Sequence, residues 1–140
     1  METIRIYAMP LMADIIPTEG RLMEIPATLE AKQKFVKGYI ERVAITEDID
    51  LIVNDSGLID HLPPNRILIN DEGEVIALLC GDIFACRHSG AEFTSIREED
   101  IPIIRKYLKV YLITMNNVMV GMDEDRYVEV FGDLGDIFDD

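Results

Sequence analysis

The side chains best suited to metal or thiol chemistry are two cysteines and two histidines, three of them close together. Cys80, Cys86 and His88 follow one another closely, and His61 lies further upstream. Structural zinc sites usually pair their cysteines at a shorter spacing and complete the set with further Cys or His ligands. The spacing therefore does not predict a metal site, and we expect no metal and no other cofactor.

A thiol nucleophile is the second chemistry that these residues suggest, with Cys86 attacking and His88 as its base. Residues two apart on a strand share a face without necessarily meeting, and no third group that would orient the histidine is evident. Both cysteines lie in an apolar stretch, where a free thiol behaves as a small hydrophobic side chain. We predict buried, reduced thiols and no catalytic residue; whether Cys80 and Cys86 pair stays open.

The segment 62–66, Leu-Pro-Pro-Asn-Arg, is the most unusual loop of the sequence. Its two prolines exclude a regular helix or a central strand. They could hold Asn65 and Arg66 at fixed angles to bind a carboxylate or phosphate, in a ligand site that also uses Arg87 and His88. The favoured interpretation is structural: the loop caps a sheet end and Arg66 pairs with one of the many acids.

The charge of the chain restricts its partners. Its 140 residues carry 27 Asp and Glu against 13 Lys and Arg, a net charge of −14. Such a field repels phosphate, which argues against direct binding of nucleic acid or of an anionic membrane. The longest apolar run, Val75–Cys80, is too short to cross a bilayer, and the first residues lack a signal-peptide pattern, so we expect a cytoplasmic protein.

Half of this net charge is concentrated in residues 123–140, where eight carboxylates accompany Arg126 and are interleaved with apolar side chains. Acidic–hydrophobic alternation is typical of segments that fold on a partner. The charge has two interpretations, solubility or mimicry of a nucleic-acid backbone. A further alternative is that the segment packs on its own core or on a second copy in a homo-oligomer. The predicted partner-binding residues are Asp123, Glu124, Asp125, Phe131, Asp133 and Phe138.

Alternation along the sequence predicts strands at Thr3–Met9 and Arg21–Ile25. Two apolar segments, Val75–Leu79 and Val110–Met122, lack a clear period and could be helix or strand. The predicted strands are Thr3–Met9, Arg21–Ile25, Tyr39–Ile45, Asp50–Asn54, Ile83–His88 and Ala91–Thr94.

Capping signals predict two helices. The first runs from Leu29 to Lys37, with Thr28 as its N-cap and Gly38 in the left-handed conformation after its end. The second begins at Ser95, which forms a capping box with Glu98, and continues to Lys109. Its apolar stripe is Ile101, Ile104 and Leu108.

These elements predict a single α+β domain. We expect a mostly antiparallel sheet of about five strands with two helices packed on one face. The core domain would cover residues 1–109, and residues 110–140 would form a C-terminal extension that is acidic from residue 123.

Several segments together resemble a known family. They are 29–41 with its Gly-Tyr-Ile-Glu end, Asn54–Gly57, Leu62–Arg66, Gly81–Phe84 and Glu92–Ile96. In this order they resemble domain of unknown function 3846, found in phages and conjugative elements, over residues 3–109. The charged Asp82 departs from the family pattern, and the extension after Lys109 inherits nothing from the resemblance.

The resemblance implies an accessory protein of a mobile element and no reaction. We expect a non-enzymatic protein that binds a basic protein, as an inhibitor or regulator of a host nucleic-acid-binding or defence protein. The alternative is a protein that binds a small ligand or nucleotide derivative through the Pro63–Arg66 loop.

Overall fold

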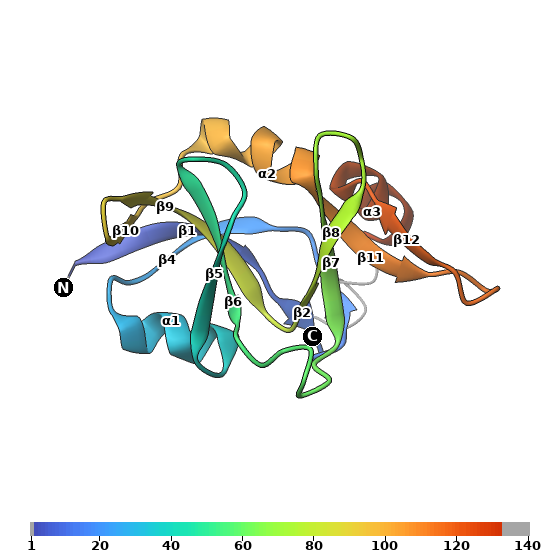
Figure 1. Ribbon diagram of the computed structural model, residues 1–140, viewed down its shortest axis with the longest axis horizontal. Helices are drawn as coiled ribbons and strands as arrows, with labels where there is room; N and C mark the ends of the chain where they lie inside the picture. The colour runs from blue at the N-terminus through green and yellow to red at the C-terminus, as the bar shows by residue number, and fades with distance from the viewer. Residues whose placement is uncertain (1, 133–140) are drawn as a thin grey trace.

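The computed structural model describes residues 2–132, in which two main antiparallel sheets and three α-helices form one domain (Figure 1). The first sheet has the strand order β4-β1-β9-β6-β5, with β10 paired to β9. No helix within these residues is long and apolar enough to cross a membrane. The strands of the first sheet are β1 (Thr3–Met9), β4 (Arg21–Pro26), β5 (Ile40–Ala44), β6 (Ile49–Asn54), β9 (Ile83–Ser89) and β10 (Glu92–Thr94).

The second sheet has the order β12-β11-β7-β8, and a small hairpin of β2 and β3 follows β1. Both segments that the sequence left undecided between helix and strand contribute to this sheet: one is β8, and the other supplies most of β11 and all of β12. The bounds are β2 (Leu11–Met12), β3 (Ile16–Pro17), β7 (Pro64–Ile69), β8 (Val75–Cys80), β11 (Leu108–Ile113) and β12 (Met119–Met122).

Helix α1 (Leu29–Val36) begins as predicted, because the Thr28 hydroxyl accepts a hydrogen bond from the amide of Ala31 at 3.1 Å. Its end differs from the prediction: Lys37, with φ of 62°, takes the left-handed conformation in place of Gly38. Gly38 is needed for space instead, since a Cβ there would lie 2.5 Å from the side-chain nitrogen of Asn54.

Helix α2 (Ile101–Tyr107) begins later than predicted, after a 3₁₀ turn at Glu98–Asp100. Ser95 does not cap it, because its hydroxyl accepts a hydrogen bond from the amide of Arg5 at 2.9 Å. At the 3₁₀ turn, the Asp100 carboxylate accepts a hydrogen bond from the amide of Arg97 at 2.9 Å. The helix also ends earlier, because residue 108 is the first of β11 and pairs with β7.

The Pro-Pro-Asn-Arg segment is part of an inner strand, so the prediction that excluded a central strand was wrong. Pro64 is the first residue of β7, and a shift in register between Pro64 and Arg66 leaves Asn65 in a bulge. Proline is tolerated at the start of a strand and next to a bulge. The chain therefore forms the first residues of β7 where the two prolines predicted a loop.

The core lies on both faces of the first sheet. One face packs under α1 around Ile6, Ile52 and Phe84, and the other packs against α2 and the second sheet around Leu51 and Ile83. The α+β class with mostly antiparallel strands is confirmed. The two predicted helices, however, lie on opposite faces of the first sheet (Figure 1), because alternate side chains of β1, β6 and β9 are apolar on both sides.

Asn65 joins the two sheets. Its side-chain nitrogen donates to the carbonyls of Met9 and Gly81, each at 2.8 Å, and its oxygen accepts from Arg66 at 2.8 Å. The residue is fully buried, so these carbonyls have no access to water in its place.

We predict that Asn65→Ala lowers the free energy of unfolding by about 2–4 kcal/mol, because it leaves buried groups without partners. Urea denaturation measures the change. Asn70→Ala, which removes an asparagine from the partly exposed turn between β7 and β8, is the control and should cost less. Equal losses in the two variants would contradict the role of Asn65.

Candidate functional site

A buried ionic cluster lies where the C-terminal helix meets the two sheets. It consists of Tyr7 on β1, Arg66 on β7, Arg105 on α2 and Glu124 at the start of α3 (Glu124–Phe131). The Glu124 carboxylate lies 2.7 Å from Arg66 Nη2 and 2.7 Å from Arg105 Nε, and it accepts a hydrogen bond from the Tyr7 hydroxyl. Arg66 is completely buried and Glu124 is 3% exposed. One carboxylate thus balances two guanidinium groups.

The remaining polar atoms of Arg66 are directed at the protein. Its Nη1 donates to Asn65, and its Nη2 also donates to the Thr18 carbonyl at 2.7 Å. Its Nε has no partner within residues 2–132. Burial, and then the Glu124 charge, raise the pKa of Tyr7 far above its ordinary value, so its hydroxyl stays protonated as a donor. Arg66 is therefore fully enclosed, and Arg105 is the member of the cluster that remains partly exposed.

The first three acids predicted to contact a partner each pair with a basic side chain of this chain. Asp123 lies 2.6 Å from Lys109 Nζ, Asp125 lies 2.6 Å from Arg105 Nη1, and Glu124 belongs to the buried cluster. Phe131 packs against the Tyr127 ring with centroids 5.2 Å apart. The segment up to residue 132 is therefore packed on its own core. The two other predicted contact residues, Asp133 and Phe138, lie outside the described residues.

The other predicted ligand residues, Arg87 and His88, point to opposite faces of β9. Arg87 donates to both oxygens of Asp100, at 2.7 and 2.8 Å. His88 Nδ1 lies 2.7 Å from Asp50 Oδ2, and Asp50 is 1% exposed with its second oxygen unpartnered among the described residues. The structure does not bring these two residues together with Asn65 and Arg66: the four belong to three separate networks.

Both cysteines are buried and free. Burial, and secondarily the charge of Asp50, raise the pKa of Cys86 to about 12, so this thiol is protonated at neutral pH and is a poor nucleophile. Within the described residues, no group of three or more His, Cys, Asp or Glu side chains is arranged to hold a metal ion.

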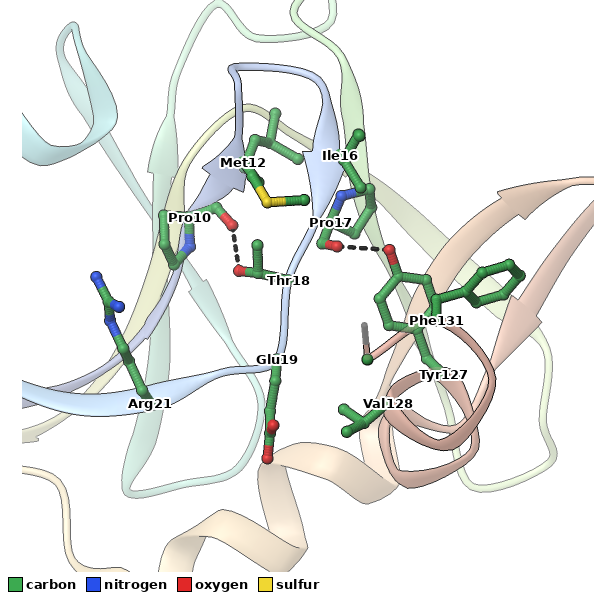
Figure 2. A pocket seen from close by; sticks show the side chains of 12 residues that line it. Pro10, Met12, Ile16, Pro17, Thr18, Glu19, Arg21, Tyr127, Val128 and Phe131 are labelled. Atoms are coloured by element: carbon green, nitrogen blue, oxygen red, sulfur yellow. Dashed lines mark hydrogen bonds between the residues drawn. The ribbon is translucent and has the colours of Figure 1, made fainter. Parts of the chain in front are cut away.

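A cavity of about 450 Å³ separates the segment 10–21 from α3 (Figure 2). Its walls include Met12, Ile16 and Phe131. Its polar side chains are largely engaged: Thr18 donates to the Pro10 carbonyl and Tyr127 to the Pro17 carbonyl, each at 2.6 Å. The charged side chains that line it are Glu19 and Arg21.

A groove of about 410 Å³ lies between strands β5 and β8, and we call it the β5–β8 groove. Its charged lining residues are two acids, Glu41 and Asp55, and no Lys, Arg or His lines it among the described residues. Its apolar lining includes large side chains that are strongly exposed: Leu58 at 60%, Ile59 at 79% and Ile76 at 59%. The remaining apolar walls are Val43, Val53 and residues 77–80 of β8.

The sequence did not predict this groove. The run Val75–Cys80 and the pair Leu58-Ile59 were visible as apolar, but only the fold shows that they meet. An exposed apolar surface with polar surroundings is characteristic of a site that contacts another molecule.

The architecture defines a protein of two antiparallel sheets joined by a buried ionic cluster. The chain belongs to the family described as domain of unknown function (DUF3846), which matches residues 12–112. Searches of curated proteins and of solved structures found no significant match. The β5–β8 groove is built entirely from residues inside the matched range, whereas Glu124 and α3 lie beyond it.

We predict that Glu124→Gln lowers the free energy of unfolding by about 3 kcal/mol, because it leaves the buried charge of Arg66 facing a neutral amide. Chemical denaturation measures the loss. The control is Asp125→Asn, whose carboxylate is 85% exposed and whose pair with Arg105 contributes under about 1 kcal/mol. A Glu124→Gln variant as stable as wild type would contradict the role of the cluster.

A second prediction concerns pH. The Arg87 guanidinium holds the pKa of Asp100 below its ordinary value, so the charged carboxylate stabilises the fold above the unfolded-state pKa, and this is lost as pH falls through the folded-state value. Asp100→Asn should therefore cost about 2 kcal/mol near pH 7 and progressively less below about pH 4. Denaturation curves of the wild type and of Asp100→Asn, recorded from pH 7 to below about pH 4, measure the difference in their free energies of unfolding. A difference that stays constant with pH would contradict the prediction.

Proposed function

We propose that this is a non-enzymatic accessory protein that acts by binding another protein, with the β5–β8 groove as its docking surface. The observation that carries the proposal is the composition of the groove: exposed Leu58, Ile59 and Ile76 lie with acids as the only charged side chains of the described lining. Burying such side chains in an interface is favourable, at about 1.5–3 kcal/mol for each one fully covered.

The partner is a basic protein. Glu41 and Asp55 at the groove, together with the net charge of −14, attract Lys and Arg and disfavour acidic partners. By contrast, Asp123, Glu124 and Asp125 already pair with basic side chains of this chain. The groove therefore replaces the C-terminal acids as the favoured contact surface.

The resemblance to proteins of phages and conjugative elements supports a role in a mobile genetic element. Proteins that bind nucleic acid carry basic surfaces. An acidic protein that covers such a surface competes with phosphate for it, which supports an inhibitor or regulator of a host nucleic-acid-binding or defence protein.

Binding of a small ligand remains the alternative function, and the cavity beside α3 favours it (Figure 2). Its size suits a small molecule. The residues involved would differ from the earlier prediction, because the cavity is lined by Arg21 and Glu19 and not by Asn65 or Arg66. A ligand there would raise the melting temperature of the wild-type protein, and Arg21→Ala would reduce the effect for an anionic ligand.

The docking surface can be tested with a displayed library of random short peptides selected on the protein. We predict that the enriched peptides combine apolar residues with Lys or Arg, and that their affinity falls as salt is added. Ile76→Ser should weaken binding about tenfold, because it removes an apolar contact. Affinity is measured by fluorescence anisotropy.

The matched control is Ile113→Ser, which makes the same change at an isoleucine that is also 59% exposed but lies on β11, away from the groove. It should leave the affinity unchanged. Equal affinity for wild type and both variants would overturn the groove as the docking surface, and so would enrichment of acidic peptides.

A further inference from the structure

Strand β5, beside the groove, is a free edge of the first sheet. It is the last strand in the order β4-β1-β9-β6-β5 and pairs with β6 alone among the described residues. A free edge presents backbone N–H and C=O groups in the spacing of a strand, which is a template for pairing with another chain.

The hydrogen bonds at its two ends show which residues face outward. The Tyr39 carbonyl accepts from the Asp55 amide at 3.0 Å, and the Ile45 amide donates to the Ile49 carbonyl at 2.9 Å. In an antiparallel pair, residues alternate between bonding the partner strand and facing away from it. Residues 41 and 43 therefore bond β6, and Ile40, Arg42 and Ala44 direct their N–H and C=O groups to the open side.

The edge also lacks two of the features that block strand pairing, a bulge and a proline. Its register with β6 runs without a shift from Ile40 opposite Asn54 to Ala44 opposite Asp50, and it contains no proline. The other wall of the groove, β8, is also an edge strand, but its pairing with β7 shifts between Leu68 and Ile69. Bulges of this kind disfavour further pairing. Of the two edges, β5 is the better template.

The groove lies beside this edge, on the face of β5 that carries Glu41 and Val43. Alternate residues of a strand added to β5 would lie on the same face and enter the groove. A basic side chain opposite Glu41 would pair with its carboxylate. An apolar side chain opposite Val43, two positions away in the added strand, would reach Ile76 on the far wall.

We infer that the partner segment binds in an extended conformation, as an additional strand on β5, with a basic and an apolar residue two positions apart facing the groove. This inference rests on the proposed function and specifies how the same site recognises its partner. Backbone hydrogen bonds would supply sequence-independent affinity, and the two groove-facing positions would supply specificity.

The test uses the peptides selected on the full-length protein. Ala44→Pro removes an outward-facing amide from an exposed position and should weaken peptide binding at least tenfold. Ala44→Val keeps the amide and favours the strand, so it should stay within about twofold of wild type. Circular dichroism and thermal melting check that both variants fold.

A second measurement does not depend on the folding of a variant. Selected peptides are N-methylated at one backbone amide at a time, and binding to the wild-type protein is measured. A strand on β5 donates from alternate residues, so loss of affinity should alternate along the peptide. Uniform tolerance of N-methylation would overturn the inference.

The outcomes separate the two proposals. Peptides that remain sensitive to Ile76→Ser but tolerate both Ala44→Pro and N-methylation would retain the groove and overturn strand addition. Insensitivity to Ile76→Ser would overturn the proposed function itself. Light scattering of the protein without peptide measures whether it forms a dimer. A dimer that Ala44→Pro dissociates would show that β5 pairs with a second copy of the chain, and it would overturn the partner proposed above.

Discussion

The arrangement of the molecule depends on a single buried carboxylate, that of Glu124. Arg66 lies in an inner strand, and its buried charge has no other carboxylate partner among the described residues, whereas Arg105 on α2 also pairs with Asp125. Removing one partner from a buried ion pair is far more costly than never having built the pair. The start of α3 is therefore fixed to β1, β7 and α2 at once, and the described C-terminal segment belongs to the domain.

This constraint determines which charges remain for a partner. The first acids of the C-terminal segment are neutralised by Arg66, Arg105 and Lys109. Strong net charge nevertheless remains on the molecule, and at the β5–β8 groove Glu41 and Asp55 have no basic residue beside them in the lining. Charge near an exposed apolar surface both steers a basic partner and keeps that surface from associating with copies of itself.

The sequence predicted those elements whose formation depends on neighbouring residues. Alternation identified β1 and β4, and the Thr28 cap identified the start of α1. The errors came from long-range contacts: Ser95 bonds Arg5, ninety positions away, and is not available as a cap. Likewise Arg66 enters an inner strand because a buried acid from α3 and the bulge at Asn65 accommodate it. The groove could not be predicted for the same reason, since β5 and β8, which form its two walls, come together only in the folded protein.

The structure also bears on the two interpretations of the acidity, solubility and mimicry of a nucleic-acid backbone. A mimic of nucleic acid needs carboxylates in a phosphate-like array, and an apolar floor beneath them would contribute nothing to that likeness. In the groove, the strongly exposed side chains of Leu58, Ile59 and Ile76 accompany the acids. A surface that combines apolar area with charge favours a protein segment that carries both kinds of side chain. Under the proposed function, the acidity would serve to select among protein partners.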